Sequence, residues 1–141
     1  MAVTPTGAFP QLPNSGSATN TGLTTANTNY TTPSNTVTIF TAGANGSDVT
    51  NVGVAVYATN TAATVDIFKK NGSAYMFLGS ALIPANTVSA TAAKPTYAIP
   101  LFDGSYVSKN NPLYLVSGDT LVASTSVTQS TFQPFAIGRD Y

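Results

Sequence analysis

The chain of 141 residues contains no cysteine, histidine, tryptophan or glutamate. Without cysteine and histidine it lacks the usual ligands of zinc, haem and iron–sulfur clusters, and it can form no disulfide. It also lacks the histidine that activates a serine or cysteine nucleophile in acyl transfer. We therefore expect no catalytic residue, no cofactor and no metal site, and we expect that the protein is not an enzyme.

Charge is also scarce, because Asp, Lys and Arg together make up only 7% of the residues and the net charge is zero. Five basic side chains cannot form the stripe that binds a phosphate backbone, so we expect no nucleic-acid partner. The N-terminus has no secretory signal, and no apolar run reaches the roughly 20 residues of a membrane helix, so we expect no membrane partner. A neutral chain has little self-repulsion, and this favours association between copies.

Thr, Ser and Asn supply about a third of the chain, and they dominate residues 1–35 together with Gly and Pro. This segment has few large apolar side chains. Their burial returns less free energy than ordering 35 residues costs at about 1–2 kcal/mol each. We expect an extended N-terminal arm that is either flexible or ordered on a neighbouring subunit by adding backbone hydrogen bonds to a sheet edge. Its expected partner-binding residues are Phe9, Leu12, Leu23 and Tyr30.

Residues 36–141 alternate short runs of Val, Thr, Ile, Tyr and Phe with turn residues, and no helical period is visible. Val52, Val54 and Val56 predict one buried strand face, and Val65 and Ile67 predict another, with Asp66 and Lys69 in solvent. Asn71 and Gly72 predict a type I′ hairpin turn, and Gly79 a bulge or a close approach. We expect a single antiparallel β-sandwich, jelly-roll or immunoglobulin-like, with strands at 36–41, 49–59, 64–70, 74–83, 96–101, 112–117, 120–128 and 131–138.

Three patterns invite a functional interpretation and have a simpler structural one. The five aspartates include Asp48, Asp103 and Asp119 in expected turns, where Asp hydrogen-bonds the local backbone, so we do not expect a catalytic pair or a calcium ladder. The loop at 43–47 lacks the lysine and the helix of a phosphate loop. The seven tyrosines fit ordinary strand composition, although they leave open a carbohydrate-binding face.

Five runs of the chain stand out as turn motifs: TVTIFTAGANGS at 36–47, IFKKNGS at 67–73, LIPANT at 82–87, GDTL at 118–121 and AIGRDY at 136–141. Together they resemble a family of small virion proteins of tailed bacteriophages. The resemblance covers residues 36–141 except 102–111, where the family has a short turn and this chain has a longer loop. It consists of turn motifs, and it transfers no catalytic residue.

The resemblance implies a structural β-sandwich of the phage particle, made in the host cytoplasm and located on the head surface as a capsid decoration (cement) protein. Its implied partners are the major capsid protein or other virion subunits, and further copies of itself in a homo-oligomer. Two alternatives remain open at this point. One is a tail, baseplate or fibre component of the same particle, and the other is a carbohydrate-binding module.

Overall fold

A computed structural model describes residues 12–17, 23–102 and 104–141 of the chain. These residues form nine strands and no helix. The described part of the chain therefore contains no helix that could cross a membrane. The strands are β1 (Leu12–Ser17), β2 (Val37–Thr41), β3 (Ser47–Val56), β4 (Ala63–Asn71), β5 (Ala74–Ile83), β6 (Thr96–Ala98), β7 (Leu113–Leu115), β8 (Asp119–Thr125) and β9 (Phe132–Asp140). Strands β2 to β9 overlap the eight expected ranges, and β1 is additional.

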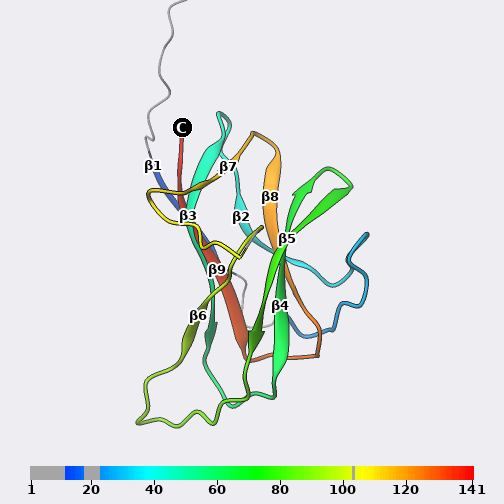
Figure 1. Cartoon of the computed structure of the whole chain (residues 1–141), viewed down its shortest axis with the longest axis vertical. Helices are drawn as coiled ribbons and strands as arrows, with labels where there is room; N and C mark the ends of the chain where they lie inside the picture. The colour runs from blue at the N-terminus through cyan, green and yellow to red at the C-terminus, as the bar shows by residue number, and fades with distance from the viewer. Residues whose placement is uncertain (1–11, 18–22, 103) are drawn as a thin grey trace, which may run out of the picture.

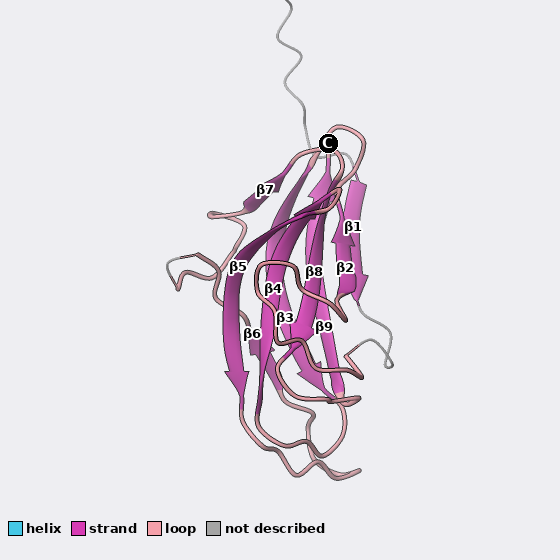
Figure 2. Ribbon diagram, turned by 90° about the vertical axis from the view of Figure 1, so that its right-hand side faces the viewer, coloured by secondary structure: helices cyan, strands magenta, loops and turns pink. Residues whose placement is uncertain are grey.

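The strands form two antiparallel sheets packed face to face, which confirms the expected β-sandwich (Figures 1 and 2). Sheet A has the order β1-β9-β3-β6, and β7 also pairs with β3. Sheet B has the order β2-β8-β4-β5. The long strands β3 and β9 form the centre of sheet A, paired from Ser47 with Asp140 to Val56 with Phe132.

The core lies between the two sheets and is formed by the alternating apolar residues of the long strands. Val52, Val54 and Val56 of β3 are buried, as are Val65 and Ile67 of β4, and this confirms the predicted inward faces. Burial of a side chain of this size contributes about 1.5–3 kcal/mol, so the strand period alone explains much of the cohesion between the sheets.

The β4–β5 hairpin differs in detail from the type I′ turn that the sequence predicts. Asn71 pairs with Ala74 as the last pair of the ladder, so the two turn residues are Gly72 and Ser73. Gly72 alone has a positive φ, of 56°, which is the pattern of a type II′ turn with glycine first. The turn therefore needs its glycine, whereas Asn71 is the last residue of β4 and its side chain can hydrogen-bond to a neighbouring strand.

Gly79 confirms the predicted irregularity in β5. The ladder between β4 and β5 shifts register between Ile67 and Phe68, opposite Gly79 and its neighbour. A Cβ atom at Gly79 would lie 2.2 Å from the carbonyl oxygen of Pro100. The chain from β6 therefore crosses directly over β5 at the one position that carries no side chain.

The described residues before position 36 pack on the sandwich of their own chain. β1 pairs along its whole length with β9, from Leu12 with Asp140 to Ser17 with Phe135. Leu23 is completely buried in the core cluster. Residues 26–35 cross the outer face of sheet B, where the N–H of Asn27 donates to the carbonyl of Thr125 at 2.8 Å.

The two ends of the sandwich are held by different chemistry. The strand ends beside the C-terminus (Figure 1) carry Asp48, Asp119 and Asp140, and each of these aspartates forms a hydrogen bond or an ion pair. At the opposite end neutral amides make the links. The side-chain N–H of Asn86 donates to Asn60 Oδ1 at 3.1 Å, and the side-chain N–H of Asn60 donates to the carbonyl of Pro84 at 2.9 Å.

Candidate functional site

The five aspartates have different surroundings, and Asp103 lies outside the described residues. Asp48 lies in strand β3 and not in the turn that the sequence predicts, because β3 begins at Ser47, two residues before the predicted start at 49. There it forms an ion pair with Arg139 of the neighbouring strand at 3.1 Å. Asp140 faces the other side of the same sheet, toward Ser47. Strand alternation therefore separates these two carboxylates.

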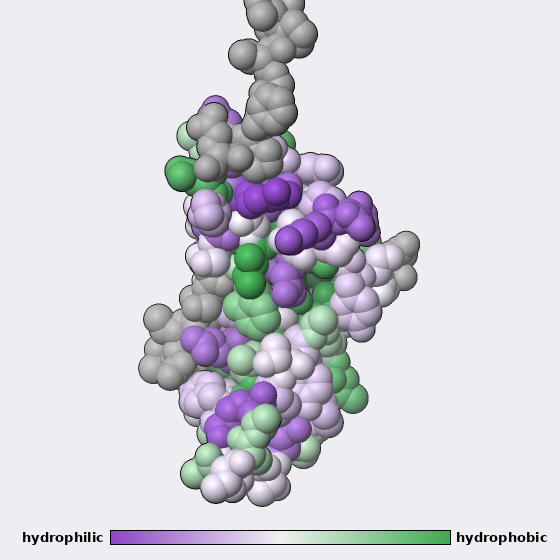
Figure 3. All heavy atoms as spheres, turned by 90° about the vertical axis from the view of Figure 1, so that its left-hand side faces the viewer, coloured by the Kyte–Doolittle hydropathy of each residue, from purple (hydrophilic) through white to green (hydrophobic). Residues whose placement is uncertain are grey.

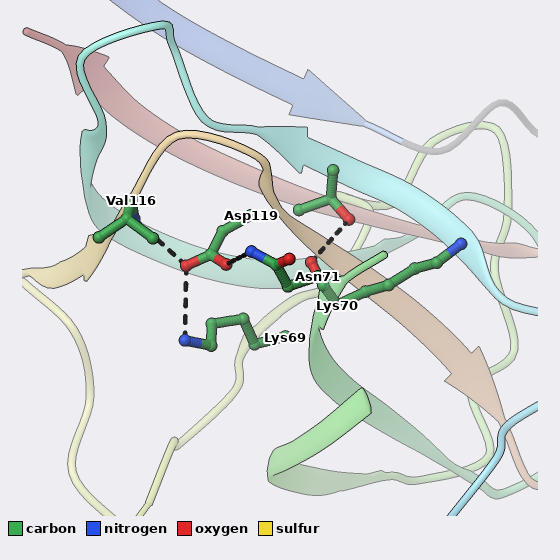
Figure 4. Close-up of polar contacts among 6 residues, drawn as sticks. Lys69, Lys70, Asn71, Val116 and Asp119 are labelled. Atoms are coloured by element: carbon green, nitrogen blue, oxygen red, sulfur yellow. Dashed lines mark hydrogen bonds and ion pairs between the residues drawn. The ribbon is translucent and has the colours of Figure 1, made fainter. Parts of the chain in front are cut away.

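Asp119 follows the turn between β7 and β8 and is the buried centre of a polar cluster whose other members reach the surface (Figure 4). One carboxylate oxygen accepts a hydrogen bond from the Asn71 side chain at 2.8 Å. The other accepts from the Val116 backbone N–H at 3.2 Å and pairs with the Lys69 ammonium at 3.4 Å. Burial acts to raise the pKa of Asp119, but these donors and the lysine charge outweigh it and lower the pKa. The cluster joins the β4–β5 hairpin to β8, which is a structural role.

Asp140 links strand β1 to the rest of the sandwich through hydrogen bonds. Its Oδ1 accepts hydrogen bonds from the Ser47 hydroxyl at 2.6 Å and from the Asn14 side chain at 2.8 Å. The Asn14 amide also donates to the carbonyl of Thr41 in β2 at 3.1 Å. The Ser47 and Asn14 donors lower the pKa of Asp140. One carboxylate thus joins β1, β3 and β9 in a single network.

Asp66 is buried, with 1% of its surface exposed, so the prediction that it lies in solvent is wrong. Alternation does place it on the outer face of sheet B, opposite Ser124 and away from the core. It is covered there by residues 26–35, whose Tyr30 ring lies 6.3 Å from the ring of Phe68. Ser80 donates to one carboxylate oxygen at 2.7 Å, and burial raises the pKa of Asp66. The prediction fails because residues 26–35, which are distant in the sequence, cover the outer face of sheet B at Asp66.

Exposed apolar side chains lie on both faces of β5, the edge strand of sheet B. The ten residues of β5 include no charged residue and no proline. Met76, Phe77 and Leu82 project from the strand, and Tyr30 packs edge-to-face on Phe77 with 5.7 Å between ring centroids. These four side chains are between 46% and 69% exposed, and we call them the β5 surface. Alternation places Phe77 and Met76 on opposite faces of the strand.

The backbone edge of β5 is nearly unoccupied within the described residues. The one backbone hydrogen bond to its outer side comes from the N–H of Phe102 to the carbonyl of Leu78, at 2.5 Å. The segment at Pro100–Phe102 and the irregularity at Gly79 protect the middle of this edge, but the strand carries no charge that would discourage pairing with another chain. On the face that lies to the left in Figure 1, the visible hydrophobic residues lie in groups among hydrophilic ones (Figure 3).

A second feature is a cavity of about 560 Å³ in the loop that precedes β7. Buried Leu101 and Leu113 form part of its lining, and exposed Phe102 and Tyr114 stand beside them. We call this cavity the loop pocket; its full lining is Leu101, Phe102, Ser105, Val107, Asn111, Pro112, Leu113 and Tyr114. Its lining overlaps the loop at 102–111.

The residues predicted to bind a partner have different environments. Phe9 lies outside the described residues. Leu12 is 66% exposed at the edge of sheet A, and Tyr30 belongs to the β5 surface. Leu23 is fully buried, so in this conformation it contacts only its own domain. The structure does not gather these side chains into one surface.

Sequence reasoning missed the exposed residues of β5 and of the loop pocket. Phe77 and Leu82 occupy the outward positions of a strand, and apolar residues at such positions were the available indication. Comparison with protein-family models, curated proteins and solved structures finds no match for this chain. Function is therefore inferred from the chain's own residues.

Proposed function

We propose that the protein is a structural component of a tailed-bacteriophage virion, and specifically a capsid decoration protein that binds the outside of the head and stabilises it. The sequence motifs at 36–47, 67–73 and 136–141 support this assignment through their resemblance to phage virion proteins. The observation that carries it is the β5 surface, an exposed apolar group beside an uncharged strand edge. Such a surface fits a protein whose task is to bind other subunits.

The proposed mechanism needs no chemistry. Burial of a side chain such as Phe77 or Leu82 contributes up to about 1.5–3 kcal/mol, and an interface without charge loses little to salt. A protein that binds only the assembled shell stabilises that shell by mass action, and many copies multiply the effect. The expected partners are the major capsid protein and neighbouring copies of this chain.

The direct test mixes purified protein with phage heads that lack it. We expect the protein to co-sediment with the heads and to raise the temperature at which they release DNA. The variants Phe77→Ser and Leu82→Ser each remove one exposed apolar side chain, so each weakens head binding about tenfold. Ile137→Ser removes an exposed apolar side chain from the outer face of sheet A and serves as the matched control. Heads that bind no protein, or that keep the same heat resistance, contradict the proposal.

A location in the tail, baseplate or fibre is the second structural assignment that the sequence resemblance allows. The same purified protein separates the two assignments when it is offered to isolated heads and isolated tails. Binding to tails alone, or microscopy of labelled virions with signal only at the tail, replaces the decoration assignment with a tail assignment.

A further inference from the structure

Residues 26–35, which lie on the outer face of sheet B, form a compact loop that is closed by its own amide side chains. The Asn27 side-chain oxygen accepts a hydrogen bond from the backbone N–H of Ser34 at 3.1 Å. The Asn35 side chain donates to the carbonyl of Ala26 at 3.1 Å and so joins the two ends. We call this segment the cover loop. A loop that is closed in this way can move as one unit.

The cover loop lies over a second apolar group, which is separate from the core between the sheets. Phe68 of β4 is 0% exposed and Val122 of β8 is 2% exposed, although the two form a cross-strand pair on the outer face of sheet B. The Tyr30 ring packs on the rings of Phe68 and Phe77, which are themselves 5.5 Å apart. The loop therefore hides an aromatic ring that continues the β5 surface.

The carboxyl group of Asp66 lies under the same loop. It stands on the same face of β4 as the hidden ring, and 1% of the residue is exposed. Ser80 of β5 donates to Oδ1 at 2.7 Å, whereas Oδ2 is buried without a regular hydrogen bond. A buried carboxylate oxygen without a partner costs free energy that water would return if the loop were displaced.

No positive charge compensates this carboxyl group within the described part of the chain, where both ion pairs involve other aspartates. The groups around it are hydroxyls, from Ser80 on β5, Ser124 on β8, Thr64 on β4 and Tyr30 on the cover loop. Among these groups only Tyr30 titrates, and its raised pKa keeps it uncharged at neutral pH. Burial therefore outweighs the hydroxyls and raises the pKa of Asp66.

We propose that the cover loop is a pH-sensitive lid, which is closed while Asp66 is protonated and opens when Asp66 ionises, so that its carboxylate meets water and Phe68 becomes exposed beside Phe77. The proton passes to solvent, and no other reactant is needed. Between the pKa values of the open and closed states, the ratio of closed to open chains falls by up to about tenfold per pH unit. This goes beyond the proposed function and does not depend on it, because the lid acts in the free chain.

Amide hydrogen exchange of the full-length protein measures the lid in solution. The N–H of Asn27 donates to the carbonyl of Thr125 at 2.8 Å, and the N–H of Ser34 donates to the Asn27 side chain, so both amides report closure. Their protection factors are corrected for the intrinsic effect of pH on exchange. We expect both factors to fall about tenfold or more between about pH 4 and pH 8, while Ile67 in the middle of β4 stays better protected than either.

Two variants with the same chemical change separate the lid from other effects of pH. Asp66→Asn keeps the shape of the side chain and removes its titration, so the protection of Asn27 and Ser34 no longer depends on pH. Asp119→Asn removes another buried carboxyl group of sheet B and leaves that dependence as in wild type.

Three outcomes overturn the proposal. The first is constant protection of Asn27 and Ser34 in the wild-type protein, which needs no variant to observe. The second is a dependence on pH that survives in Asp66→Asn. The third is protection that falls to the same value at Ile67 as in the loop, because the whole domain then unfolds and no lid opens.

Discussion

Leu23 tests most sharply whether the residues before position 36 belong to the domain. Its side chain is completely buried in the core cluster, and its carbonyl accepts a hydrogen bond from the Gln129 N–H at 3.2 Å. Leu23→Ala leaves a cavity there, which costs about 2–5 kcal/mol of unfolding free energy. A domain of this length unfolds with an entropy of about 0.3 kcal/mol per kelvin, so the melting temperature falls by about 7–17 °C.

Leu12→Ala is the matched control, because Leu12 precedes the same segment and is 66% exposed. Its expected cost is below about 0.5 kcal/mol, as for most surface substitutions. Calorimetry and urea titration of both variants measure the difference. Equal melting temperatures for Leu23→Ala and Leu12→Ala would refute the packing of this segment on its own sandwich, and would favour an arm that is ordered only on a neighbour.

Three further predictions concern the polar clusters and one close backbone contact. Asp119→Asn lowers the free energy of unfolding at pH 7. Folding lowers the pKa of Asp119, so the stabilisation by its carboxylate is present above the unfolded pKa and disappears as pH falls through the folded pKa. Urea titrations of the variant and the wild type therefore converge in acid. Asp66→Asn has the opposite effect on the pH dependence of stability. Folding raises the pKa of Asp66, so its protonated form favours folding and this stabilisation is lost as pH rises through the folded pKa. The variant therefore gains stability relative to wild type between acid and neutral pH. Gly79→Ala forces a Cβ against the Pro100 carbonyl and costs about 1–3 kcal/mol, which thermal unfolding measures; a melting temperature equal to that of wild type would show that the crossing segment can move away.

The strand pattern was predictable because it is local. Alternating valines place one face of β3 in the core whatever else the chain does, and glycine at position 72 marks a turn by its own backbone freedom. The details that depend on partners across the fold were not predictable. The period of β4 places Asp66 on the outer face correctly, but its burial depends on residues 26–35, far away in the sequence.

The candidate sites were predictable only in part. Tyr30 was expected to contact a partner, and it does lie on an exposed apolar surface, but the rest of that surface comes from β5. A strand such as β5 reads as apolar on both faces, so its sequence does not indicate which residues the core will cover. Phe102, which lines the loop pocket, has a left-handed backbone, and its residue type does not signal that conformation.

The contrast between the two ends of the sandwich has a consequence for how the protein responds to low pH. The donors around Asp119 and Asp140 lower the pKa of both carboxyl groups and so favour their anionic forms, whereas the Asn60–Asn86 pair at the other end does not titrate. Acidification should therefore weaken the contacts of β1 and β9 at the end of the sandwich that carries the aspartates, while the contacts at the opposite end stay intact.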